Sequence, residues 1–291
     1  MPPRAFRLPA RLSAAAALLA LAGCGGASLT AATPPTSSVP RTQAAASPPA
    51  SPTPSVQPSP SPSPQPLAGK VILIDPGHNG GNAADPQYIN QLVNVITESK
   101  PCDTVGAETD AGYPEHAFNF SVAIRLARLL RAEGAKVVLT RTSDHGVGPC
   151  ITQRAALGNQ VHADAAISIH ADGGPPGGSG FDVIEPGLVP GYTNAIVGPS
   201  ARLGRDLRNA FHRITGEPYA NYVGQNAIDV RTDLGGLNLS QVPKVFVECA
   251  NMRNAADAAR LTSPAWRQRA AVALAAGFTK FLTAGSPAGS G

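Results

Sequence analysis

The sequence predicts an α/β fold, in which a single domain contains a mostly parallel twisted sheet flanked by helices. Short apolar runs rich in Val, Ile and Ala alternate along the chain with longer segments. In the longer segments the apolar residues recur at helical spacing, as at Phe118, Val122 and Leu126. Strands and helices that alternate in this way are typical of a parallel sheet covered by helices.

The expected strands are short apolar runs bounded by Gly, Pro or polar residues: 70–75, 135–140, 165–170, 180–184 and 244–248. The expected helices are a short one over 87–97 and longer ones over 114–133, 151–162, 198–214 and 265–282. The helix over 114–133 has clear signals at both ends, because Pro114 suits a first helical position and Gly134 favours termination. Residues 83–112 are otherwise expected to be irregular and to lie over part of a cleft.

The N-terminal residues 1–23 have the pattern of a lipoprotein signal peptide. Three arginines precede an apolar run from Leu12 to Ala22, which is too short to cross a bilayer as a helix. The run ends in Leu-Ala-Gly-Cys at Cys24, and this ending resembles a bacterial lipobox whose cysteine is lipidated. We therefore expect export and a lipid anchor on the outer face of the cytoplasmic membrane, facing the cell wall. An ordinary cleaved signal with an incidental cysteine is the alternative.

Composition divides the rest of the chain into three parts. Residues 24–68 are rich in Pro, Ser and Ala and hold too little apolar surface to form a core, which predicts a disordered tether. Residues 69–284 have the length of one globular domain, and residues 285–291 are expected to form a flexible tail.

The charge balance argues against nucleic-acid binding. The net charge of +4 looks basic, but four of the 23 Lys and Arg residues lie before residue 65. The remaining 19 face all 19 Asp and Glu residues, so the expected domain is neutral and lacks a basic footprint.

Three cysteines lie in the expected domain. Cys102 and Cys150 occur in loop-like sequence and make a plausible pair in an exported protein. Cys249 follows an apolar strand, which favours a buried free thiol. Pairing of Cys249 with either of the other two remains open at this point.

Ionisable residues end several of the apolar strands. The first strand runs into Asp75 and then His78, a later one into His170, and the last into Glu248. In α/β sheets, ligand sites gather at the carboxyl ends of the strands. Glu115 and His116 lie in the first turn of a helix, and either is a candidate ligand. Two histidines and a carboxylate are the ligand set of hydrolytic zinc sites, so the residues predict a metal-assisted amide or ester hydrolase.

The ordered set of motifs resembles a known family. The motifs are Ile74-Asp75-Pro76-Gly77-His78, Glu115 at a helix start, Ser168-Ile169-His170-Ala171-Asp172, and Val247-Glu248 followed by Asn254. Together they resemble the type 3 zinc-dependent N-acetylmuramoyl-L-alanine amidases, most of all the mycobacterial and actinobacterial members. The resemblance runs from Val71 to Phe281.

The resemblance implies that His78, Glu115 and His170 bind one Zn²⁺ and that Glu248 is the general base and then the general acid. It implies hydrolysis of the amide between the lactyl group of muramic acid and L-Ala of the peptidoglycan stem peptide. It also supports a disulfide between Cys102 and Cys150. Two other functions are kept open: a zinc peptidase acting within the stem peptide, and a non-catalytic lipoprotein that binds peptidoglycan.

Other residues carry weaker predictions. Asp75 is expected to orient His78, or else to end its strand by hydrogen bonding. Arg231 and Asn238 lie in or near a Gly-rich loop and are predicted to contact substrate, with solvated loop residues as the alternative. Asn254 is expected to cap a helix. The domain is expected to be a monomer.

Overall fold

The structure is a computed structural model that describes residues 65–284. The predictions for the signal peptide, Cys24, most of the tether and the tail lie outside the described residues. The packed chain begins before Gly69, where the sequence placed the domain boundary. Leu67 is fully buried, and its N–H donates to the carbonyl of Glu133 at 2.9 Å. None of the helices between residues 65 and 284 is long and apolar enough to cross a membrane.

Within the described residues, six strands form a mixed sheet in the order β4-β1-β5-β8-β6-β7. Their bounds are β1 Val71–Pro76, β4 Lys136–Leu139, β5 Ala165–Asp172, β6 Asp182–Pro186, β7 Ile228–Arg231 and β8 Lys244–Asn251. Every neighbouring pair is parallel except β6 with β8. The predicted mostly parallel α/β fold is therefore confirmed.

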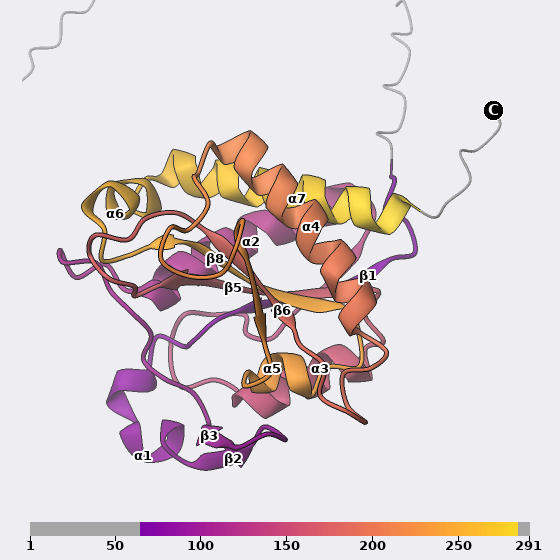
Figure 1. Cartoon of the computed structure of the whole chain (residues 1–291), viewed down its shortest axis with the longest axis horizontal. Coiled ribbons are helices and arrows are strands. Elements are labelled where there is room, and N and C mark those ends of the chain that lie inside the picture. The colour runs from indigo at the N-terminus through magenta and orange to yellow at the C-terminus, as the bar shows by residue number, and fades with distance from the viewer. Residues whose placement is uncertain (1–64, 285–291) are drawn as a thin grey trace, which may run out of the picture. The chain divides into compact units, whose positions relative to one another are not determined.

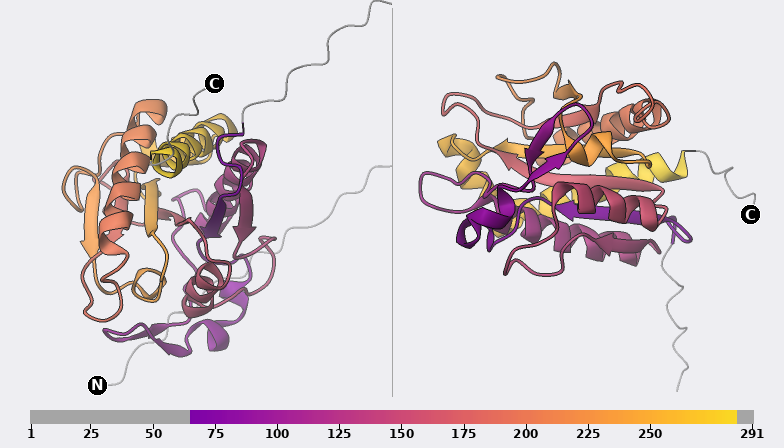
Figure 2. Two further views of the ribbon diagram at one scale, coloured as in Figure 1. Left: turned by 90° about the vertical axis from the view of Figure 1, so that its right-hand side faces the viewer. Right: turned by 90° about the horizontal axis from the view of Figure 1, so that it is seen from below.

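Helices cover both faces of this sheet, as Figures 1 and 2 show. Their bounds are α2 Glu115–Ala132, α3 Ile151–Gln160, α4 Val197–Thr215, α5 Gly235–Asn238, α6 Ala255–Leu261 and α7 Pro264–Thr283. Helices α2, α4 and α7 pack on one face and share the main hydrophobic core with the strands. Helix α3 packs on the other face over Leu73 and Ala166, with α5 beside it.

The central strands are apolar on both faces because both are covered. In β5 the first five residues are all buried, as expected for an interior strand of a parallel sheet. In α2 the buried residues Phe118, Val122, Leu126 and Leu130 recur every four residues and face the sheet. Gly134 ends this segment with a φ of 96°, a conformation that favours glycine.

The predicted helix over 87–97 is wrong. A short helix α1 covers only Pro86–Ile89, and a hairpin of β2 (Leu92–Asn94) and β3 (Ser99–Pro101) follows, after a 3₁₀ turn at Asn82–Ala84. Branched residues such as Val93 and Val95 favour strands. The Asn94 side chain accepts a hydrogen bond from the N–H of Ile96 at 2.7 Å and so favours a turn there.

The other predicted elements are present, with ends shifted by a few residues. Two short elements were not predicted, β7 and α5, which have four residues each, and the seven-residue helix α6 was predicted only through its cap. The side chain of Asn254 accepts hydrogen bonds from the N–H groups of Ala256 and Asp257, so the predicted helix cap is confirmed at the start of α6.

Candidate functional site

His78 lies two residues beyond the end of β1 and is held by its Nδ1 atom. Nδ1 is 3.0 Å from the carbonyl oxygen of Thr104 and 3.2 Å from Oδ1 of Asp103. The other ring nitrogen, Nε2, is 3.2 Å from Oε2 of Glu115. Burial lowers the pKa of His78, but Glu115 and Asp103 outweigh this effect and raise that pKa to about 10 in the metal-free protein.

Glu115 is the first residue of α2 and is almost completely buried. Its Oε2 atom accepts a hydrogen bond from the N–H of Ala107 at 2.8 Å, and Oε1 accepts one from the N–H of Ala171 at 3.2 Å. Burial raises the pKa of this carboxyl, but His78 and His170 outweigh burial and hold the pKa well below its usual range. Glu115 therefore remains an anion, as a metal ligand must be.

His170 lies near the end of β5 and faces the same point from a neighbouring strand. Its Nδ1 atom is 2.9 Å from Oε1 of Glu115, and its ring stacks on Phe246 with centroids 5.2 Å apart. Gly77 is required beside it, because a Cβ atom at that position would overlap the ring of His170. The two imidazoles meet edge to face with centroids 5.0 Å apart.

These three side chains form a candidate metal centre at the carboxyl ends of the strands. His78, Glu115 and His170 each offer one ligand atom, and the three atoms lie within 4.8 Å of one another. The residue types are those of hydrolytic zinc sites. The hydrogen bonds at Nδ1 of His78 leave Nε2 for a metal ion, which is the usual arrangement for a metal-binding histidine. The donor set therefore fits a metal ion.

Glu248 lines the same hollow as the cluster. It is directly opposite His170 in the parallel β5–β8 register, and both line one cavity together with His78 and Glu115. Its Oε2 atom is buried without a hydrogen-bond partner. Burial, followed by the charges of Glu115, Asp182 and Asp172, raises the pKa of Glu248 well above its usual value. A carboxyl with a raised pKa and an open face is suited to accepting and returning a proton.

Comparison with known proteins agrees with this geometry. The profile of the N-acetylmuramoyl-L-alanine amidase family matches residues 72–280. The chain belongs to this family. An N-acetylmuramoyl-L-alanine amidase of Mycobacterium tuberculosis is 41% identical over 216 residues, which cover 74% of this chain and 88% of the relative.

Solved structures of mycobacterial amidases are also similar. The amidase Ami1 of Mycobacterium smegmatis matches with a TM-score of 0.71 and 40% identity, over 75% of this chain and 99% of that one. The apo form of Ami1 from Mycobacterium abscessus matches with a TM-score of 0.69 and 40% identity, over 74% and 100% of the two chains. The likeness thus extends over the whole domain.

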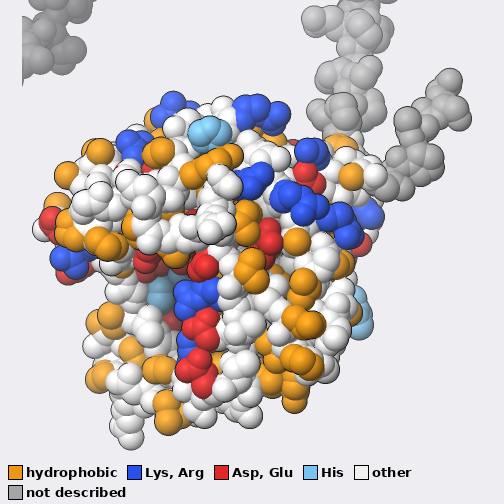
Figure 3. All heavy atoms as spheres, viewed as in Figure 1, with side chains coloured by type: hydrophobic (Ala, Val, Ile, Leu, Met, Phe, Trp, Pro, Cys, Tyr) orange, Lys and Arg blue, Asp and Glu red, His pale blue; other side chains and the backbone are white. Residues whose placement is uncertain are grey.

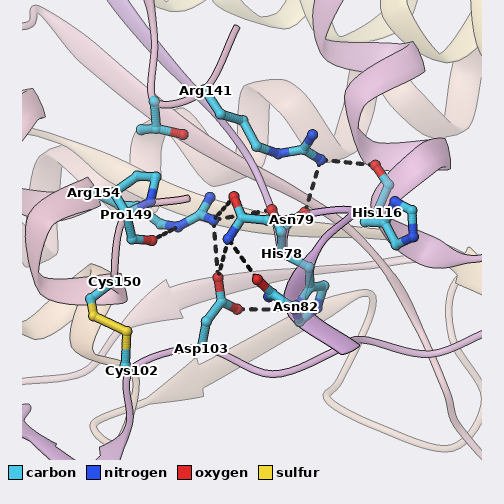
Figure 4. A network of polar contacts seen from close by, with 12 residues as sticks. His78, Asn79, Asn82, Cys102, Asp103, His116, Arg141, Pro149, Cys150 and Arg154 are labelled. Atoms are coloured by element: carbon cyan, nitrogen blue, oxygen red, sulfur yellow. Dashed lines mark hydrogen bonds and ion pairs between the residues drawn. A yellow bond between two sulfur atoms is a disulfide. The ribbon is translucent and has the colours of Figure 1, made fainter. Parts of the chain in front are cut away.

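In this amidase Asp75 does not orient His78, so that prediction is wrong. The Asp75 carboxylate accepts hydrogen bonds from Thr140, Ser168, Arg154 and Lys244 and lies under the site. The backbone of His78 has a φ of 58°, in the left-handed region, and its ring contacts Asp103 and Thr104 instead of Asp75. Asp103 takes the orienting position instead, as Figure 4 shows. The alternative prediction, a strand-end residue engaged in hydrogen bonds, describes Asp75.

Asp103 is itself fixed by a buried network that the sequence did not reveal. Its Oδ2 atom accepts from Arg154 at 3.0 Å and from Nδ2 of Asn79 at 2.9 Å. The neighbouring Cys102 forms a disulfide with Cys150. Cys150 immediately precedes α3, the helix that contains Arg154. The predicted disulfide is present, and Cys249 is a free buried thiol. The position of Asp103 beside Cys102 was the sequence feature that could have drawn attention to Asp103. No local pattern links Asp103 to His78.

The two predicted substrate contacts have different surroundings. Arg231 ends β7, lines the cavity of Glu248, and makes two hydrogen bonds to Asp233 at 2.8 and 2.6 Å. Asn238 is buried, and its Nδ2 atom donates to the carbonyl oxygens of Val95 and Thr232 at 2.9 and 2.7 Å. The predicted substrate contact of Asn238 is therefore wrong, because its amide joins the β2–β3 hairpin to the loop before α5.

Proposed function

We propose that this amidase hydrolyses the amide between the lactyl group of muramic acid and L-Ala of the peptidoglycan stem peptide, using one Zn²⁺. The observation that carries the proposal is the cluster of His78, Glu115 and His170, with Glu248 lining the same hollow. Membership of the amidase family supports the choice of bond.

The three clustered residues would hold the ion and leave a coordination position open. A zinc ion bound by two histidines and a carboxylate lowers the pKa of a bound water to about 7 and polarises a carbonyl oxygen. Glu115 supplies the negative charge, because two N–H donors and two imidazoles hold it ionised. Stacking on Phe246 fixes the ring plane of His170.

Glu248 would carry the proton. Its carboxylate accepts the proton from the attacking water and then donates it to the nitrogen of L-Ala as the amide bond breaks. The raised pKa of Glu248 favours the protonated form at this second stage. Arg231 lines the same hollow, and we propose that it contacts a carboxylate of the stem peptide.

We also propose that the protein is exported and anchored by a lipid on Cys24, acting as a monomer on peptidoglycan. The support is the Leu-Ala-Gly-Cys ending of the apolar N-terminal run. Cell fractionation and mass spectrometry of the mature N-terminus test this part. The wild type is expected in the membrane fraction with a lipidated cysteine, and Cys24→Ala is expected to lose the lipid. A soluble wild-type protein cleaved elsewhere would contradict the anchor.

Mass spectrometry of muropeptides incubated with residues 65–291 tests the activity. Free stem peptide beginning at L-Ala is expected, and it should be absent with a chelator and with Glu248→Ala. Shortened peptides still joined to muramic acid would identify a peptidase. Intact muropeptides that bind a zinc-loaded protein would instead identify a non-catalytic peptidoglycan-binding protein.

A further inference from the structure

A third histidine, His116, lies beside the candidate metal centre and takes no part in it. His116 follows Glu115 in the first turn of α2, and helical geometry turns its side chain about 100° away from Glu115. Its Nδ1 atom is 3.0 and 2.9 Å from the two carboxylate oxygens of Asp144. Arg141 donates to Asp144 at 2.8 Å and to the carbonyl oxygen of His116 at 2.8 Å. These contacts fix the orientation of the ring.

The same contacts determine which ring atom is available to a ligand. Nδ1 faces a carboxylate and therefore carries the hydrogen. A neutral imidazole then presents a lone pair at Nε2, which accepts hydrogen bonds from O–H and N–H groups. No hydrogen bond of Nε2 occurs within residues 65–284, and the side chain is 20% exposed.

His116 lines a hollow together with five Gly and Ala residues and with Asn79, Val105, Glu108 and Pro114. Gly80, Ala83, Gly106, Ala107 and Gly112 surround it. A Cβ atom at Gly80 would overlap the carbonyl oxygen of Asp144, so this wall has no room for a side chain. Gly106 and Ala107 also line the cavity of the metal cluster, so the two hollows share a wall. The two hollows are thus adjacent.

The charges differ on the two sides of the metal cluster. On the side of Phe246, Lys100 pairs with Asp233 at 2.6 Å and with Glu98 at 3.8 Å, and Arg231 pairs with Asp233 at 2.6 Å, so two basic side chains lie at this side. Figure 3 shows basic and acidic side chains alternating beside a recessed histidine in the middle of the face in view. Around His116, Arg141 balances Asp144, and the exposed carboxylate of Glu108 lies in the wall. Basic side chains therefore line only the first side, since no Lys or Arg of the described residues lines the hollow of His116, and a substrate arm with carboxylates fits the first side better than the second.

We propose that the hollow of His116 binds the sugar and that Nε2 of His116 accepts a hydrogen bond from a hydroxyl or amide N–H of the muramic acid residue. This inference rests on the proposed amidase function, in which a sugar and a peptide with free carboxylates lie on opposite sides of the cleaved bond.

The test compares two substrates of His116→Leu: a disaccharide muropeptide and a D-lactoyl stem peptide that lacks the sugar. Loss of one hydrogen bond is expected to raise KM for the muropeptide about tenfold. KM for the lactoyl peptide and the zinc content should stay unchanged. His116→Gln, whose amide can donate to Asp144 and still present an oxygen, should recover part of the loss. His212→Leu on the exposed surface of α4 is the matched control and should change neither KM.

Competition by the free disaccharide provides a second readout that does not depend on muropeptide turnover. It should inhibit lactoyl-peptide cleavage by the wild type and do so about tenfold more weakly in His116→Leu. Equal KM changes on both substrates, or loss of zinc, would overturn the sugar site and leave His116 a structural residue. A wild type inactive on both substrates would overturn the proposed function, and the sugar site with it.

Discussion

Glu115 on α2 and Glu248 on β8 are the same kind of side chain and line one hollow, and their surroundings give them opposite properties. Glu115 receives main-chain N–H donors and two imidazoles, and these hold its pKa low. Glu248 lies in a row of carboxylates, with Asp182 directly opposite it in the antiparallel β6–β8 register, and its pKa is high. The surroundings of Glu115 keep it ionised and suit the binding of a cation, and the surroundings of Glu248 favour its protonated form.

The largest expected effect separates these two roles. Glu115→Gln should lose zinc, because it removes the one anionic ligand, and with it all measurable activity. Glu248→Gln should keep zinc but lower kcat by about 10²–10⁴-fold, the usual contribution of a general base. Metal analysis after desalting and kcat on a muropeptide measure both. Equal loss of zinc in the two variants would mean that Glu248 is a ligand and would remove the distinction.

The next effect concerns the contribution of the buried ion pairs of Asp75, under the metal cluster, to the stability of the fold. Asp75 is the buried partner of Lys244, at 3.3 Å, and of Arg154, at 2.8 Å. Asp75→Asn leaves Lys244 buried without its counter-ion, which should lower the free energy of unfolding by about 3–5 kcal/mol. Urea denaturation measures the change. Asp110→Asn, at an exposed carboxylate, is the control and should change stability by less than about 0.5 kcal/mol. A small effect in Asp75→Asn would show that water or another group compensates Lys244.

On the Glu248 side the removal of a carboxylate should stabilise the fold. Burial, followed by the charges of Asp172 and Asp229, raises the pKa of Asp182 from 3.8 to about 7. Between these two values the folded state binds a proton that the unfolded state does not, so stability falls as the pH rises from about 4 to 7. Asp182→Asn should remove this slope and stabilise the metal-free domain above pH 7 by roughly 3–4 kcal/mol.

Melting temperatures between pH 4 and 9, measured in a chelator, test this prediction. A smaller slope of the same sign should remain in the variant, because burial also raises the pKa of Glu185 to about 7. Identical slopes in wild type and Asp182→Asn would mean that Asp182 is not protonated in the fold, and the contrast between the two sides would then rest on Glu248 alone.

The sequence predicted the parts of the fold and the site whose signals are local. Long periodic segments such as that of α2 predicted helices, and apolar runs that stop on an ionisable residue predicted where His78 and His170 lie. The family resemblance was needed to choose between Glu115 and His116 as the metal ligand. The two residues are adjacent in one helical turn, so their distances along the sequence to the other candidate ligands do not distinguish them.

The misses come from contacts between distant segments. Asp103 is 25 residues from His78 and reaches it through a loop that the disulfide and Arg154 hold in place. Asn238 is 143 residues from Val95, its hydrogen-bond partner. No periodicity or propensity encodes such pairs. The β2–β3 hairpin was missed because its strands are very short. Their alternating pattern did not outweigh the apparent helical spacing of residues 87–97.

The smallest expected effect tests whether Asp103, and not Asp75, orients His78. Asp103→Asn should weaken zinc binding about tenfold, the low end for loss of a partner behind a metal-binding histidine. The effect is limited because the carbonyl oxygen of Thr104 still accepts from Nδ1 of His78 at 3.0 Å. Competition with a chromophoric chelator at fixed pH measures the affinity. Folded Asp75→Asn should bind zinc as the wild type does, because Asp75 makes no hydrogen bond to His78. If Asp75→Asn weakened zinc binding more than Asp103→Asn did, Asp75 would be the residue that orients His78. The loop that the disulfide holds in place would then not have this role.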